Sequence, residues 1–137
     1  MSCLFCTIVA GQAPAATVLE HPDALGFLDT APVFPGHVLL VPRVHVVTLA
    51  ELPAELLGPF FAQVQRVSVA LPVALGCEGT WVSMNNIVSQ SVPHLHVHVV
   101  PRTRKDGLRG FYWPRQKYPD AEALATMAQR ITDALSS

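Results

Sequence analysis

Three histidines within five residues constrain this chain more than any other feature of its sequence. His94, His96 and His98 alternate with apolar residues, and further apolar residues follow them. In an extended strand, residues two apart point to the same face, roughly 6.6 Å from one another. We therefore expect a strand over residues 94–100 with the imidazoles on one face and the core on the other. Imidazole serves as nucleophile, proton carrier, phosphate ligand or metal ligand near neutral pH, so this strand is the first candidate for a functional site.

The rest of the chain predicts an α+β fold with an antiparallel sheet, in one domain over residues 1–137. A chain of 137 residues, half of them hydrophobic and only 14% charged, can bury a core and is not disordered. Prolines at positions 59 and 72 should bend or interrupt the long helix. Strands and helices alternate irregularly, which favours α+β over a βαβ fold. We expect strands over residues 17–20, 24–28, 38–41 and 80–84, and helices over residues 4–10, 52–75 and 120–135.

The charge and the first residues exclude several classes of protein. A net charge of −1 offers no basic surface for nucleic acid. The N-terminal residues lack the basic region and apolar run of a signal peptide, and no apolar run is long enough to span a membrane. We therefore expect a cytoplasmic protein without nucleic-acid or membrane partners.

Cys3 and Cys6 form a C-x-x-C pair that is open to three interpretations. An odd total of three cysteines argues against a disulfide framework. Two thiolates can bind zinc, but a tetrahedral site needs two more ligands, for which His45 and His94 are the candidates. A redox pair is the second interpretation, although no thioredoxin-like βαβ unit follows. Two unliganded cysteines are the third.

Gln90 and Ser91 directly precede the histidine run. The Ser91 hydroxyl can donate a proton and the Gln90 amide can donate a hydrogen bond, which suits a phosphoryl group and its leaving atom. A nucleophilic histidine divides a difficult displacement into two easier steps through a covalent intermediate. His96, at the centre, is best placed to attack phosphorus while neighbouring imidazoles bind the charged oxygens. A zinc-dependent hydrolase with all three histidines as ligands is the rival.

Outside this region the sequence gives weaker signals. Asp29 follows the expected strand over residues 24–28, where a carboxylate can bind ribose hydroxyls or simply shape a turn. We interpret His21 and His37 as surface residues. Trp113 belongs to an aromatic cluster and could shape a partner's pocket or pack on its neighbours.

These residues together resemble the histidine triad (HIT) family, in its bacterial nucleotide-binding, Hint-like branch. Residues 94–100 match the His-φ-His-φ-His-φ-φ signature, where φ is apolar, and Gln90 and Ser91 fit the segment that leads into it. Residues 5–11, 26–30 and 35–45 also resemble that branch, so the resemblance covers roughly residues 3–102.

The resemblance implies a HIT-like fold that pairs into a homodimer and acts on a purine nucleotide. The implied reaction is hydrolysis or transfer at the α-phosphate of AMP-type phosphoramidates or esters through a covalent nucleotidyl-histidine. His96 would be the nucleophile and His98 the phosphate ligand, with Ser91 and Gln90 assisting. The implied nucleotide-binding residues are Phe27, Leu28, Asp29, Asn85, Gln90, Ser91, His96 and His98. The implied ligands of a structural zinc are Cys3, Cys6, His45 and His94.

Two other functions remain open: a dinucleoside polyphosphate hydrolase, and a nucleotide-binding regulatory protein with little catalysis. The chain also departs from the family in the loop before Gln90. That loop is about two residues shorter than expected and carries Ile87, Val88 and Ser89 where many members have glycines. Either Asn85 or Asn86 could therefore face the phosphate.

Overall fold

The computed structural model of the chain describes residues 2–108 and 115–136, so Trp113 lies outside the described residues. The chain forms two compact units, Met1–Asp106 and Gly107–Ser137. No helix among the described residues has both the length and the apolar character needed to cross a bilayer.

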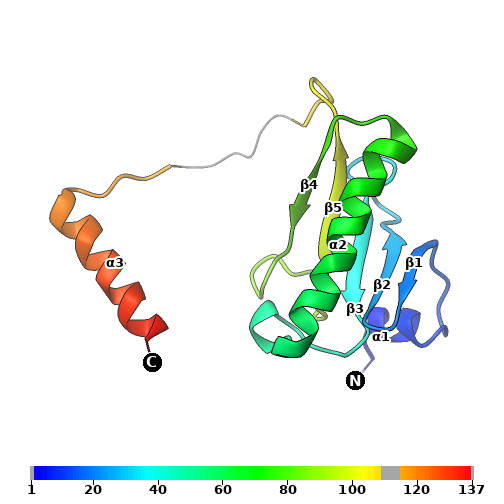
Figure 1. Ribbon diagram of the computed structural model, residues 1–137, viewed down its shortest axis with the longest axis horizontal. Helices are drawn as coiled ribbons and strands as arrows, with labels where there is room; N and C mark the ends of the chain where they lie inside the picture. The colour runs from blue at the N-terminus through cyan, green and yellow to red at the C-terminus, as the bar shows by residue number, and fades with distance from the viewer. Residues whose placement is uncertain (1, 109–114, 137) are drawn as a thin grey trace. The chain divides into compact units, whose positions relative to one another are not determined.

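A five-stranded antiparallel sheet forms the first unit (Figure 1). This confirms the predicted α+β class. The order β1-β2-β3-β5-β4 leaves β1 and β4 at the two edges. The strand bounds are β1 Thr17–His21, β2 Ala24–Leu28, β3 Val38–Pro42, β4 Gly79–Ser83 and β5 Val97–Arg102.

Helix α2 (Ala54–Leu75) covers one face of this sheet. The expected interruption at its prolines is wrong, because α2 runs through both Pro59 and Pro72. A proline inside a helix costs about 3 kcal/mol. Burial of apolar side chains, at about 1.5–3 kcal/mol each, offsets that cost. The helix ends where Gly76 adopts the left-handed conformation. The buried α2 side chains that pack on the sheet are Phe60, Val64, Val67 and Leu71.

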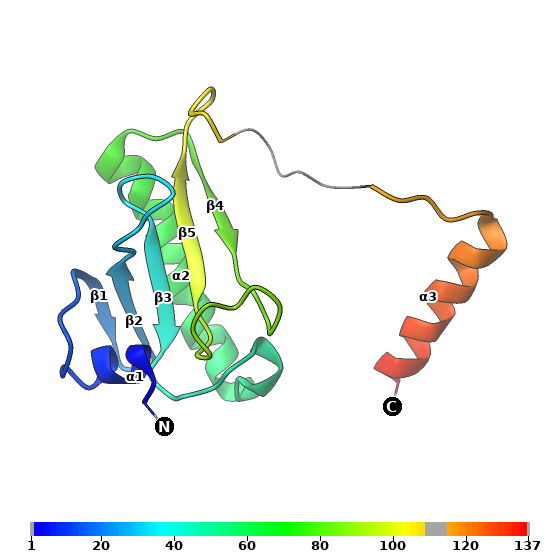
Figure 2. The same cartoon turned by 180° about the vertical axis from the view of Figure 1, so that it is seen from behind.

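The opposite face of the sheet carries a smaller core and the short helix α1 (Leu4–Val9). Figure 2, seen from behind, shows α1 in front of the sheet and α2 behind it. Phe5 of α1 packs edge-on against Phe27 of β2, with ring centroids 5.4 Å apart. This second core consists of Phe5, Leu25, Phe27, Leu39 and Val41. The sheet therefore has one face filled by α2 and another that α1 covers only in part.

The second unit contains helix α3 (Ala121–Leu135), in agreement with the helix predicted over residues 120–135. Asp120 caps it, because its Oδ1 accepts a hydrogen bond of 2.8 Å from the backbone N–H of Ala123. The apolar residues at helical spacing on α3 are exposed within the chain: Leu124, Met127, Ile131 and Leu135.

Candidate active site

The histidine run keeps its alternation although its strand is shorter than predicted. Strand β5 begins only at Val97, so the expected strand start at His94 is wrong. The backbone N–H of His94 bonds Val92 in a tight turn, and the N–H of Leu95 bonds Val46 instead of a neighbouring strand. The side chain of Leu95 still packs into the core that α2 covers. The histidines consequently point to the α1 side of the sheet.

At its far end β5 continues beyond the predicted stop and includes Pro101. Strand β3 pairs with β5 only as far as Val99, so from there on β5 pairs with β4 alone. A proline is tolerated where one side of a strand carries no ladder hydrogen bonds.

His94 lies with Cys3, Cys6 and His45 in a cluster of possible metal ligands. Its Nε2–H donates to the carbonyl of Pro42 at 2.9 Å, which leaves the Nδ1 lone pair pointing at the cluster. His94 Nδ1 lies 3.5 Å from each of the two sulfurs and 3.2 Å from His45 Nδ1. Cys6 Sγ lies 3.2 Å from His45 Nδ1. The structure thus brings together all four residues predicted to bind zinc.

These distances agree with the geometry of tetrahedral zinc. Bonds of about 2.3 Å to sulfur and about 2.05 Å to nitrogen place sulfur and nitrogen about 3.5 Å apart, and two nitrogens about 3.3 Å apart. Without a cation, desolvation and the adjacent Cys3 raise the pKa of the Cys6 thiol. A bound zinc ion would reverse that effect, because it stabilises the thiolate. The residues present therefore fit a Cys₂His₂ zinc site.

His96 is buried next to this cluster but uses the opposite ring nitrogen. Its Nδ1–H donates to the backbone carbonyl of His94 at 2.8 Å. The proton is thereby held on Nδ1, and the Nε2 lone pair remains available for attack. The Phe5 ring packs edge-on against His96 with centroids 5.1 Å apart and fixes the orientation of the imidazole. This is the arrangement that a nucleophilic imidazole requires.

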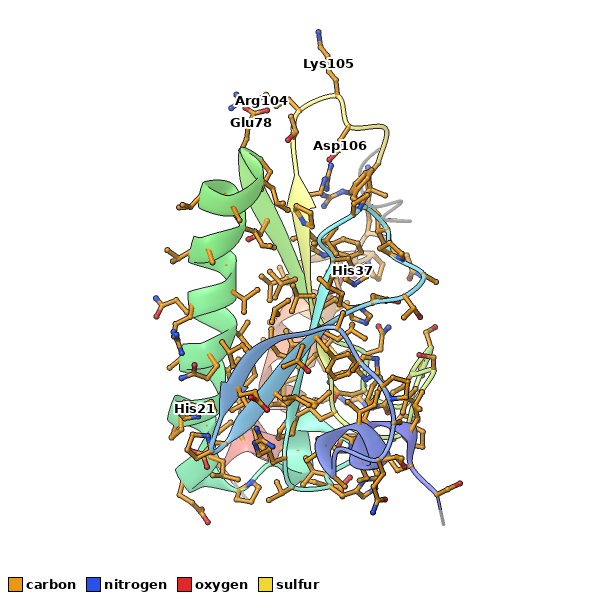
Figure 3. The ribbon with its side chains drawn as sticks, turned by 90° about the vertical axis from the view of Figure 1, so that its right-hand side faces the viewer. His21, His37, Glu78, Arg104, Lys105 and Asp106 are labelled. Atoms are coloured by element: carbon orange, nitrogen blue, oxygen red, sulfur yellow. The ribbon has the colours of Figure 1, made fainter. Side chains whose placement is uncertain are left out.

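His37 is a candidate site residue whose predicted position is wrong. It was expected on the surface, yet it is only 3% exposed. Figure 3 shows it within the body of the unit, whereas the side chain of Lys105 points away. His37 Nδ1 accepts from the backbone N–H of Val33 at 3.1 Å. The proton of a neutral His37 therefore sits on Nε2, which lies 3.0 Å from His98 Nδ1.

This contact sets the proton on His98. Because His37 Nε2–H donates to His98 Nδ1, the proton of His98 lies on Nε2, where it can bond an anionic oxygen. Burial lowers the pKa of His98 to about 4, with the neighbouring His96 and His37 acting in the same direction. His98 is thus a neutral donor near pH 7.

Asp29, His37 and His98 also lie close enough together to suggest a second metal site. The hydrogen bonds argue against it. The N–H of Val33 keeps the proton of His37 on Nε2, the atom that would have to bind the metal. We interpret this group as a hydrogen bond from His37 to His98 with the Asp29 carboxylate nearby. Asp29 Oδ2 lies 3.8 Å from His37 Nε2, and the other oxygen accepts from the N–H of Ala31 at 2.9 Å.

Phe27 and Leu28 point to opposite faces of the sheet. Phe27, Leu39 and His98 are in register across β2, β3 and β5, so Phe27 lies on the same face as the catalytic candidates. The side chain of Leu28 packs into the α2-side core and lines an apolar groove beside α2. Leu28 can therefore meet a ligand on the histidine face only through its backbone.

The polar residues before the histidines are mostly engaged with the protein. Gln90 accepts from the N–H of Ile87 at 3.1 Å and donates to the carbonyl of Val47 at 2.6 Å. Asn86 accepts from the N–H of Leu49 at 2.8 Å, and Asn85 donates to a loop carbonyl at 3.2 Å. The side chain of Gln90 thus braces the loop, which differs from its expected contact with phosphate.

Ser91 differs from these neighbours. It is exposed, and its hydroxyl makes no hydrogen bond with the other residues that the structure describes. Its hydroxyl is available to a ligand.

Comparison with known proteins agrees with the resemblance to the histidine triad family. The HIT domain family model matches residues 10–105. Adenosine 5'-monophosphoramidase hnt1 of Schizosaccharomyces pombe is 34% identical over 135 residues, which cover 96% of this chain and 97% of that protein.

Two solved structures are also similar. A HIT family protein from Bacillus subtilis has a TM-score of 0.91 and 33% identity, covering 100% of this chain and 99% of that one. A zinc-bound histidine triad family protein from Mycobacterium smegmatis has a TM-score of 0.75 and 35% identity, covering 95% and 98%. With the triad geometry described above, these matches show that the chain belongs to the histidine triad family and is a nucleotide hydrolase of that family.

Proposed function

We propose that this protein hydrolyses AMP-type phosphoramidates or esters, with His96 attacking the α-phosphate to form a covalent nucleotidyl-histidine. The observation that carries the proposal is the hydrogen bond from His96 Nδ1 to the carbonyl of His94, which leaves Nε2 free as the nucleophile. The relative from Schizosaccharomyces pombe, named as an adenosine 5'-monophosphoramidase, supports this choice of substrate.

In the first step, the lone pair of His96 Nε2 forms a bond to phosphorus as the bond to the leaving nitrogen or oxygen breaks. The leaving atom takes the electron pair and a proton relayed from solvent by the hydroxyl of Ser91. The N–H of His98 Nε2 stabilises the charge on the phosphoryl oxygens. In the second step water attacks phosphorus, the bond to His96 breaks, and AMP is released with the water proton passing to solvent.

The nucleoside half of the substrate would lie beside β2. Phe27 offers an apolar ring on the histidine face for the base, and Asp29 follows at the end of the strand. One Asp29 oxygen is fixed by the N–H of Ala31, and the other can accept from ribose hydroxyls. We therefore propose for both residues the roles that the family resemblance implies.

We propose that zinc binds Cys3, Cys6, His45 and His94 as a structural ion. When bound, it supplies a cross-link between α1 and the two histidine-bearing segments, and no chemistry at the substrate. The similar structure from Mycobacterium smegmatis, which is zinc-bound, supports this proposal. Thiolate ligands suit a reducing compartment, and we propose the cytoplasm as the location.

We also propose that the protein acts as a homodimer. Strand β4 is an edge strand, and Val82 on it is exposed within the chain. An exposed edge strand offers backbone groups for pairing with a second copy. Light scattering coupled to size-exclusion chromatography would give the dimer mass, and a monomer mass at micromolar concentration would contradict it.

The proposed activity can be tested by incubating the purified protein with adenosine 5'-phosphoramidate and with diadenosine tetraphosphate. We expect release of AMP from the phosphoramidate with a kcat/KM at least about tenfold higher than for the dinucleotide. Chromatography of the products measures both rates. Preference for diadenosine tetraphosphate would favour the polyphosphate hydrolase, and tight AMP binding without turnover of either would favour a regulatory protein.

A further inference from the structure

The loop over residues 85–91 exposes two apolar side chains on a strained backbone. Ile87 has a φ of 70° and Ser89 a φ of 61°, in the left-handed region that favours glycine. A β-branched residue there is a conformational outlier. Ile87 and Val88 are nonetheless 69% and 78% exposed, so burial within the chain does not offset the strain. Strained residues of this kind cluster at ligand-binding sites.

Hydrogen bonds fix the backbone of this loop. Gln90 Oε1 accepts from the N–H of Ile87 at 3.1 Å, and the N–H of Gln90 returns a bond of 3.3 Å to the carbonyl of Ile87. The side chains of Gln90 and Asn86 also tie the loop to Val47 and Leu49. The exposure of Ile87 and Val88 is therefore a fixed property of the fold.

The loop over residues 85–91 ends at the residue proposed to serve the leaving atom. It runs directly into Ser91, whose hydroxyl serves the leaving atom, whereas Phe27 and Asp29 hold the nucleoside half. In an in-line displacement the leaving group departs opposite the attacking nitrogen of His96. Ile87 and Val88 precede Ser91 by four and three residues in this loop, which makes their side chains candidates for contact with the leaving group.

The composition of the loop favours one class of leaving group. Residues 85–91 contain no lysine or arginine. A polyphosphate leaving group carries several negative charges and is normally bound by such cations. Two branched hydrocarbon side chains instead favour contact with another hydrocarbon.

We propose that Ile87 and Val88 are specificity-determining residues that select amine or alcohol leaving groups with a hydrocarbon body. This inference rests on the proposed hydrolysis of AMP phosphoramidates and esters, and it names the class of substrate within them.

The test compares two substrates that differ only in the leaving group: AMP amide, which releases ammonia, and AMP N-hexylamide, which releases an alkylamine. In the double variant Ile87→Asn, Val88→Thr, both residues become polar, threonine keeps the β-branched shape of valine, and asparagine tolerates a positive φ. We expect kcat/KM for the hexylamide to fall about tenfold, while kcat/KM for the amide changes by less than about twofold.

Three outcomes would overturn the inference. Equal losses on both substrates would make the loop a general part of catalysis, and no loss on either would mean that the apolar pair does not meet the leaving group. A wild-type preference for diadenosine tetraphosphate over the hexylamide would also contradict it. Absence of wild-type turnover on every substrate would overturn the proposed function itself, which distinguishes that failure from the others.

Stability gives an independent readout. The single variant Ile87→Asn should raise Tm by about 4 °C, because it relieves the left-handed strain and loses little burial. The matched variant Val88→Thr should leave Tm unchanged. A fall in Tm for Ile87→Asn would assign the side chain a structural packing role and would overturn the inference.

Discussion

The first two histidines of the run present the same side chain in opposite ways. His94 donates from Nε2 to the carbonyl of Pro42, so its Nδ1 faces the cysteines and His45. His96 donates from Nδ1 to the carbonyl of His94, so its Nε2 stays free. In each case one backbone carbonyl decides which nitrogen has the lone pair. The difference between a metal ligand and a nucleophile is thus set by the backbone around two otherwise identical residues.

His94 and His96 are also connected, because the carbonyl that orients the His96 ring belongs to His94. Zinc bound to the His94 ring would hold that carbonyl in place without touching the substrate. His94 is therefore expected to govern stability and His96 turnover. The following predictions test this division.

The largest effect is expected at the nucleophile. His96→Asn removes the attacking nitrogen and should lower kcat by more than about 10³-fold, with little change in Tm. Steady-state hydrolysis of AMP phosphoramidate and thermal unfolding measure the two quantities. Turnover within tenfold of the wild type would remove the distinction in role between His94 and His96.

The metal cluster should show the reverse pattern. Cys3→Ser should abolish zinc binding and lower the free energy of unfolding by about 3 kcal/mol, while kcat falls by no more than about tenfold. The matched control is Cys77→Ser, because Cys77 lies outside the cluster. Metal analysis, urea unfolding and kinetics provide the measurements. Complete loss of turnover in a folded, zinc-free variant would make the ion catalytic.

His37 extends this comparison to His98, the third histidine of the run. His37→Phe keeps a buried ring but removes the hydrogen bond to His98, so we expect kcat to fall about 30-fold. The matched control, His21→Gln, changes a histidine whose Nδ1 accepts from the backbone N–H of Asp23 in a turn, and it should leave kcat unchanged. A positioning role also predicts an altered pH profile of kcat in His37→Phe. An unchanged profile with lower Tm would leave His37 a purely structural residue.

The smallest effect concerns stability against pH. The pKa of His98 is about 4 in the folded chain because of burial, against 6.5 for an exposed histidine. Between these values the unfolded chain binds a proton that the folded chain does not, so stability is complete above pH 6.5 and declines toward pH 4. At 1.36 kcal/mol per pKa unit the loss is at most about 3 kcal/mol, and solvent contact reduces it to about 1–2 kcal/mol.

Urea unfolding of the wild type and of His98→Asn between pH 7 and 4 would measure this loss. The free energy of unfolding of His98→Asn should decline less steeply with falling pH than that of the wild type. His37, whose pKa burial also lowers, contributes in the same direction and accounts for part of the remaining slope. Parallel curves for the two proteins would show that His98 is not buried as a neutral ring.

The sequence predicted the alternation of the run because the period of a strand is local. The apolar neighbours of His96 fixed its face even where the regular strand had not yet begun. It did not predict the continuous α2, because the burial of Phe60 and its neighbours, which outweighs two prolines, is a tertiary effect. His37 was missed for the same reason. A histidine after Pro35 and Gly36 is typical of a surface turn, and only packing against His98 buries it.

The most direct test of the division within the run is to trap and locate the covalent intermediate. Wild-type protein mixed with AMP N-hexylamide and quenched in base should gain the mass of one adenylyl group, and peptide mapping should place it on His96. His96→Asn should gain nothing, whereas Cys3→Ser should still be labelled. A label on His94 or His98 would contradict the account. Steady turnover by wild-type protein that never carries the adenylyl group would contradict it as well.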